Sequence, residues 1–156
     1  MPTSNSNSLS ITTRCYPALL LLLSVLFFLR VLGQAIQRWL PQTFLPPFDA
    51  FQGSNLPYWL LLSLQVMILT VMIFLTWKVY CRVLIPRANV GKALLWIGCI
   101  YMGGSILRII VGLTVPNAPA WFSTWIPAVF HVVLAAFTLT LASFHLRESR
   151  MFEKVK

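Results

Sequence analysis

The stretch Tyr58–Tyr80, with the sequence YWLLLSLQVMILTVMIFLTWKVY, decides which class of fold this chain adopts. Its only charged residue is Lys78, near its end. A helix needs about 20 predominantly apolar residues to cross the hydrocarbon core of a bilayer, and this stretch is long enough. Both of its ends carry aromatic side chains of the kind that gather at membrane interfaces, namely Tyr58, Trp59, Trp77 and Tyr80. We therefore predict a transmembrane helix over residues 58–80.

Three more apolar stretches, at about 17–36, 93–113 and 122–144, have the same character. Over the whole chain 58% of the residues are hydrophobic and 10% are charged, whereas a soluble domain carries about 25% charged residues. So few polar side chains cannot cover a globule in water. The sequence therefore predicts an all-α fold, an integral membrane bundle of four transmembrane helices within residues 17–146.

The two ends of the chain are predicted to lie outside this bundle, with residues 1–16 as a flexible polar leader and 147–156 as a charged cytoplasmic tail. The apolar stretch 17–36 has two interpretations, because Arg30 interrupts it. It is either a retained transmembrane helix whose arginine reaches towards an interface, or a signal peptide cleaved after Gly33. A charge is unfavourable in the apolar core of a signal peptide, so the retained helix is favoured.

The distribution of basic residues predicts how the bundle is oriented. The chain has a formal net charge of +9, from 12 Lys and Arg against three acids. The loop between the second and third spans is basic, and the loop between the third and fourth is uncharged. By the positive-inside rule, the basic loop and both termini face the cytoplasm, and we predict a bacterial inner membrane. The charge also suits membrane lipids as partners. No nucleic-acid binding is predicted, because no basic stripe with interleaved aromatic residues lies outside the spans. The basic loop contains Arg82, Arg87 and Lys92.

Small and polar residues recur at helical spacing in the third and fourth spans. Such residues avoid lipid and let two helix backbones approach closely, so we expect the two spans to pack as an antiparallel pair. The face of the third span contains Gly98, Tyr101, Ser105, Arg108 and Gly112, and that of the fourth contains His131, Ala135, Thr138, Ala142 and His145. The predicted packing residues are Gly98, Gly112, Ala135, Thr138 and Ala142.

Four polar side chains from four spans are predicted to share one layer, three of them roughly 9 to 13 Å from the outer ends of their helices and Arg30 a little shallower. They are Arg30, Gln65, Arg108 and His131. A cation inside the membrane needs a backbone carbonyl, a water-filled cavity or an anionic ligand. One interpretation is therefore a pocket for a quinone or an anionic lipid, with Tyr101 and Ser105 also lining it. In the other interpretation Arg108 caps backbone carbonyls or reaches outwards, and His131 and Gln65 only hold the helices together.

The sequence contains no arrangement typical of a catalytic centre. All three acids, Asp49, Glu148 and Glu153, lie outside the predicted spans, which favours a role other than catalysis. The three cysteines lack the close spacing of a zinc site or a disulfide framework, so no metal is predicted. A pair of haems, one bound by His131 and one by His145, is a remote alternative. These residues lie about 21 Å apart along one helix, and each haem would need a second axial ligand.

A small chain without catalytic groups is predicted to be an accessory, assembly or stabilising component of a larger membrane complex. Its partners would be other membrane proteins or further copies of itself. The alternative is a binding protein for a lipid-soluble or anionic ligand, with the layer of Gln65, Arg108 and His131 as its pocket. The remote alternative is a haem-binding electron-transfer subunit. No cofactor is predicted, with quinone or haem as the alternatives.

Overall fold

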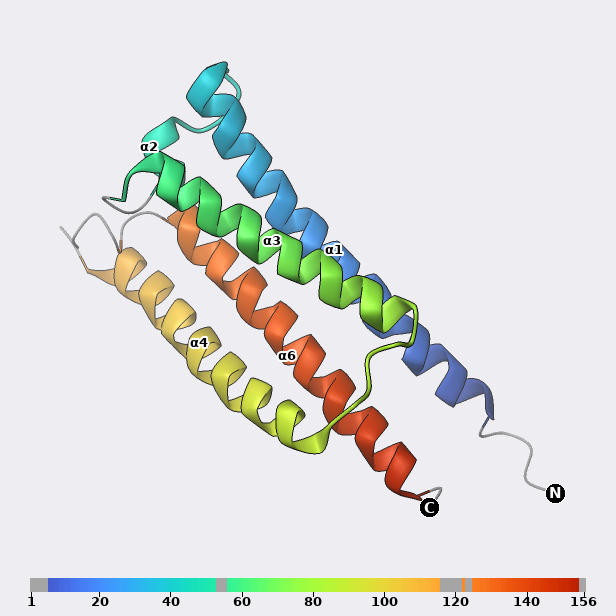
Figure 1. The fold of residues 1–156 in the computed structure, drawn as a ribbon. Coiled ribbons are helices and arrows are strands. Elements are labelled where there is room, and N and C mark those ends of the chain that lie inside the picture. Colours follow the sequence, from blue (N-terminus) through green and yellow to red (C-terminus); the bar gives the residue numbers. More distant parts are fainter. Residues whose placement is uncertain (1–5, 53–55, 116–121, 123–124, 155–156) are drawn as a thin grey trace.

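The structure, a computed structural model, describes residues 6–52, 56–115, 122 and 125–154. Over these ranges the regular structure is entirely helical, and four of the helices are long and apolar enough to cross a membrane. A short fifth helix lies at one end (Figure 1). The helices are α1 (Ser6–Trp39), α2 (Phe48–Gln52), α3 (Tyr58–Tyr80), α4 (Ala88–Thr114) and α6 (Trp125–Lys154). The predicted all-helical class and the four apolar helices are thus confirmed.

The helix boundaries differ from the predicted spans wherever a helix continues beyond its apolar core. α3 has the bounds predicted from its sequence, because a proline precedes it and a turn closes it. α1 begins at Ser6, inside the stretch for which the sequence predicts a flexible leader. α6 continues through the predicted tail to Lys154, since no glycine or proline follows Pro127 to stop it. Pro127 itself lies in the first turn of α6, where a backbone N–H has no partner within the helix.

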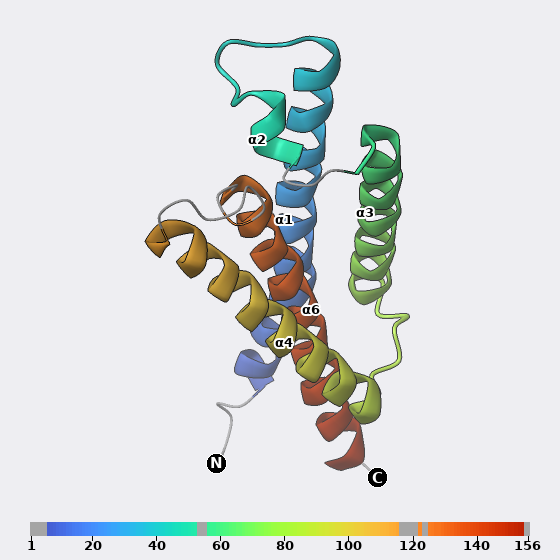
Figure 2. The same ribbon diagram turned by 90° about the vertical axis from the view of Figure 1, so that its left-hand side faces the viewer.

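The long helices follow the packing order α3–α1–α6–α4. α4 packs most extensively against α6, and α1 contacts both α6 and α3 (Figures 1 and 2). α2 lies against α1 and α6 at one end of the bundle. The first turns of α1 and the last turns of α6 lie together at the opposite end, which we call the terminal end (Figure 1). Which end faces the cytoplasm remains a prediction from the charges.

Glycines set the close contact between α4 and α6. A Cβ atom added at Gly98 would lie 2.7 Å from Leu139 Cδ2, well inside van der Waals contact. A Cβ atom at Gly91 would lie 2.8 Å from Leu146 Cγ. On α6, Ala135 and Ala142 are completely buried. The glycine face of α4 therefore lies against α6 at Leu139 and Leu146, and Gly91 extends this contact beyond the residues predicted from the sequence.

An apolar cavity of about 250 Å³ separates part of α3 from α4 and α6. It exists because α3 packs against α1 rather than against the α4–α6 pair. Its lining is formed by Met67, Ile68, Val71, Met72, Leu75, Leu94, Leu134, Phe137, Thr138 and Leu141. We call it the central cavity.

Candidate functional site

Two polar side chains of α1 point into the bundle at the end that carries α2. Arg30 and Gln34 lie four residues apart, so they share one helical face. Their side chains are 8% and 0% exposed. The Arg30 Nη2 atom donates a hydrogen bond to the carbonyl of Phe51 at 3.0 Å. The Phe51 ring lies over Gly33, 3.8 Å from where a Cβ atom would stand. The short helix α2 therefore supplies a backbone acceptor to a buried cation.

A pair of glutamines joins α1 to α3 in the same region. The Gln65 amide, 4% exposed, donates to the Gln34 side-chain oxygen at 3.0 Å. The remaining amide atoms, Gln34 Nε2 and Gln65 Oε1, have no hydrogen-bond partner. Exchanging the oxygen and nitrogen positions of both side chains reverses the roles but leaves the same result. One amide donor and one amide acceptor stay unpaired between the two helices.

The α4–α6 pair brings further polar groups to this region. The rings of Tyr101 and His131 meet edge to face, with centroids 5.8 Å apart. His131 Nδ1 is hydrogen-bonded to the carbonyl of Pro127. Because a carbonyl only accepts, Nδ1 carries the proton, and Nε2 of the neutral ring is left as an acceptor. Both Arg30 and Arg108 lie close enough to His131 to interact with it electrostatically. Two buried arginines from different helices thus lie within electrostatic range of one histidine.

Arg30 links the two halves of this region. Its guanidinium lies over the ring of Phe130 on α6, 5.9 Å from the ring centroid, which is a favourable contact for a cation. Its Nε atom is buried without a hydrogen-bond partner, and so is the hydroxyl of Tyr58 on α3. Within the described part of the chain, no carboxylate forms an ion pair with Arg30. We use the term polar layer for Arg30, Gln34, Tyr58, Gln65, Arg108 and His131.

The residues predicted from the sequence have different environments. Arg30, Gln65 and Arg108 are buried, and His131 and Tyr101 are half-buried. Ser105 is also buried, but its hydroxyl donates to the carbonyl of Tyr101 one turn earlier at 2.7 Å. That bond occupies the Ser105 hydroxyl within its own helix.

Gln34, Tyr58 and the carbonyl of Phe51 were not predicted as parts of the site. The spacing of four residues between Arg30 and Gln34 is the signal that could have identified Gln34, since it places both on one face. The sequence indicates only an interfacial role for the Tyr58 ring. No sequence pattern marks a backbone carbonyl as the partner of a particular arginine.

The geometry at His145 bears on the haem alternative. The backbone N–H of Arg87 donates to Nδ1 of His145 at 3.1 Å. A neutral imidazole that accepts at Nδ1 carries its proton on Nε2, and this Nε2 cannot ligate iron unless the contact with Arg87 breaks. Among the described residues, no group of three or more His, Cys, Asp or Glu could hold a metal ion. The haem alternative stays a prediction.

The polar layer draws side chains from α1, α3, α4 and α6 and combines hydrogen-bond donors, acceptors and positive charge. An unpaired buried polar group costs about 1–3 kcal/mol. A polar group that paired with these atoms would recover part of this cost. Comparison with known proteins adds no relative, since no protein-family model, no curated protein and no solved structure matches the chain.

Proposed function

We propose that this chain is a membrane protein that binds a lipid-soluble ligand with an anionic or carbonyl head group in the polar layer. A quinone and an anionic lipid both have this chemistry. The observation that supports the proposal is the set of unpaired polar atoms on side chains that are more than nine-tenths buried, on Arg30, Gln34 and Gln65. Side chains that served only to hold helices together would be expected to satisfy one another.

The unpaired atoms indicate what the head group must offer. Arg30 Nε and Gln34 Nε2 are donors, so the ligand needs oxygen acceptors such as those of a carbonyl or a carboxylate. The positive charge of Arg30 favours an anion, because a cation in an apolar environment is stabilised by an opposite charge. Gln65 Oε1 can accept from a hydroxyl group. The apolar remainder of the ligand would lie among the hydrophobic side chains of the bundle.

Replacing Arg30 by methionine tests the proposal. We expect Arg30→Met to retain about tenfold less ligand, which corresponds to the loss of about 1.4 kcal/mol from one charged hydrogen bond. Native mass spectrometry of the purified protein would measure retention of two probes, decylubiquinone and oleate. A loss for oleate alone would identify an anionic ligand, and a loss for both would identify binding through carbonyl oxygens.

The matched control is Arg38→Met. Arg38 belongs to the same helix, but its side chain is exposed, with its guanidinium 5.8 Å from the ring centroid of Phe48. We expect this variant to retain both probes at the level of the wild type. Equal retention by wild type, Arg30→Met and Arg38→Met would contradict the proposal.

A role as a component of a larger membrane complex is the second candidate function. The observation in its favour is the central cavity, because packing of helices in membranes is driven by close van der Waals contact and α3 leaves part of that contact unmade. Blue-native electrophoresis after mild detergent extraction should then show a species well above 17.7 kDa with a co-purified membrane protein. A strictly monomeric species without a partner would count against this role.

A further inference from the structure

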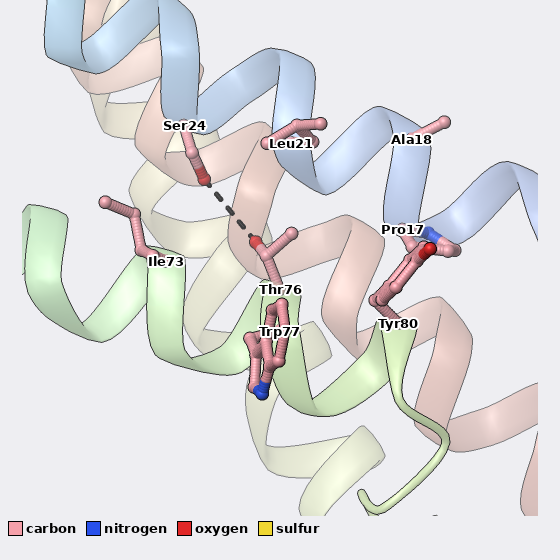
Figure 3. Close-up of a pocket in the computed structure, with 8 residues that line it drawn as sticks. All are labelled: Pro17, Ala18, Leu21, Ser24, Ile73, Thr76, Trp77 and Tyr80. Atoms are coloured by element: carbon pink, nitrogen blue, oxygen red, sulfur yellow. Dashed lines mark hydrogen bonds between the residues drawn. The ribbon is translucent and has the colours of Figure 1, made fainter.

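A second cavity lies at the terminal end, away from the polar layer. It is a groove of about 550 Å³ between α1 and α3, a volume within the range of about 300 to 1,000 Å³ typical of ligand pockets. Figure 3 shows the residues that line it along the two helices. We call it the α1–α3 groove, and its lining is formed by Pro17, Ala18, Leu21, Ser24, Ile73, Thr76, Trp77 and Tyr80.

The polarity of the α1–α3 groove changes along its length. At the end of α3 its lining includes the exposed rings of Trp77 and Tyr80, which are typical of a membrane interface. One to two turns further in, about 10 Å from Tyr80 along the helix, the lining includes Leu21 and Ile73. The groove thus has a polar rim and an apolar interior. This order matches the polarity of a lipid, whose head group lies at the interface and whose acyl chain lies in the hydrocarbon.

The two hydroxyl groups inside the groove, those of Ser24 and Thr76, have no proton left to donate to a ligand. Ser24 and Thr76 face each other with their hydroxyl oxygens 3.5 Å apart (Figure 3). Each hydroxyl donates to a carbonyl of its own helix at 2.8 Å, Ser24 to Leu20 and Thr76 to Met72. The interior of the groove therefore suits a hydrocarbon chain rather than a polar head group.

Arg82, two residues beyond Tyr80, has a strained backbone. It ends α3 with a positive φ of 56°, and its N–H bonds to the carbonyl of Val79 while that of Val83 bonds to the carbonyl of Lys78. This helix ending normally has glycine at the left-handed position. Because strained residues cluster at functional sites, an arginine at this position indicates that its exposed side chain has a functional role.

The charges along the chain at this turn are all positive. Between the end of α3 and the first turns of α4 the chain carries four basic residues and no acid. They are Lys78, Arg82, Arg87 and Lys92. Basic residues next to a transmembrane helix attract anionic lipid head groups, at about 1 kcal/mol each. The head group that fits beside Trp77 and Tyr80 is therefore an anionic one.

From the groove, the strained arginine and the local charge, we propose that the α1–α3 groove holds an acyl chain of an anionic phospholipid whose phosphate is bound by Arg82. This site stands independently of the polar layer, because it draws on different residues at the opposite end of the bundle. It is a site for a structural lipid of the surrounding bilayer.

Lipid retention by the full chain tests this proposal. The purified protein in detergent would be mixed with equal amounts of phosphatidylglycerol and phosphatidylcholine with identical acyl chains, and the bound lipid measured by native mass spectrometry. We expect about a fivefold preference for phosphatidylglycerol, the size of one arginine at an anionic surface. Arg82→Gly should abolish this preference while leaving the melting temperature equal or higher, since glycine relieves the strained φ. Arg82→Lys should keep the preference.

Filling the groove separates it from other lipid contacts. Ala18 is exposed and lines the groove, so Ala18→Phe should remove the preferentially bound lipid without disturbing a buried contact. Ala93→Phe, at an exposed position of α4, is the matched control and should bind lipid as the wild type does. Arg30→Met should also leave this lipid in place, which distinguishes the groove from the polar layer. Wild-type phosphatidylglycerol retention in Ala18→Phe, or an unchanged preference in Arg82→Gly, would overturn the proposal.

Discussion

Replacing Gly98 by leucine should lower the free energy of unfolding by about 3 kcal/mol, the upper range for adding atoms to a packed interface. Gly98 is buried where α4 meets α6. The first added atom would already lie 2.7 and 2.9 Å from two atoms of the Leu139 side chain and 3.5 Å from the Leu139 backbone nitrogen. Leu139 can turn away from a methyl group, but a leucine would also press against the backbone of α6. The helices would have to separate.

Gly103→Leu is the matched control for this effect. Gly103 belongs to the same helix and is exposed, and a Cβ atom there meets nothing within 4 Å. Its replacement should leave stability unchanged or raise it by about 0.5–1 kcal/mol, because glycine is unfavourable inside a helix. Titration with a denaturing detergent in mixed micelles would compare the two variants. Similar losses at both positions would mean that α4 and α6 do not pack through Gly98.

Gln65→Leu should destabilise the fold by about 1.5 kcal/mol, within the range for removing one partner of a buried hydrogen bond. The change leaves the Gln34 amide, which is completely buried, without its one hydrogen-bond partner in α3. The double variant Gln34→Leu with Gln65→Leu should recover most of the loss, since it leaves no buried amide unpaired. The same titration would measure the wild type, both single variants and the double variant.

The double variant also separates packing from binding. If the glutamines only join α1 to α3, it should be stable and retain decylubiquinone and oleate as the wild type does. If they contribute to the polar layer as proposed, it should be stable yet retain about tenfold less of the bound probe. Normal stability with normal retention would therefore remove the glutamines from the proposed site.

The sequence predicts the four long helices of this fold well, because a membrane span is recognised by its length and hydrophobicity. Tyr58–Tyr80 has its predicted bounds because interfacial rings mark its ends. Gly98 belongs to a spacing of small residues in the sequence, and it lies against Leu139 of α6. Ala135 and Ala142 belong to a similar spacing, and both are completely buried. The extensions of α1 and α6 were not predicted, because hydrophobicity marks the extent of the hydrocarbon and not the end of a helix.

The candidate site was predicted only in part, because some of its groups come from the main chain and not from side chains. Arg30, Gln65 and Arg108 are conspicuous as polar residues in apolar stretches, and all three are buried. The partner of Arg30 is a main-chain carbonyl in α2, and every residue has such a group. The strain at Arg82 arises from a positive φ angle that arginine rarely adopts. The residue type therefore does not predict this backbone conformation.

The order α3–α1–α6–α4 divides the molecule into two hairpins, and the division runs through the polar layer. The first hairpin pairs α1 with α3, the second pairs α4 with α6, and among the long helices contact between the hairpins is made mainly by α1 and α6. Arg30 belongs to one hairpin and His131 to the other. The contact between α1 and α6, which is as extensive as that between α1 and α3, therefore sets the distance between these groups. The proposed ligand would then bridge the two hairpins through their polar side chains and add to the direct contact between α1 and α6.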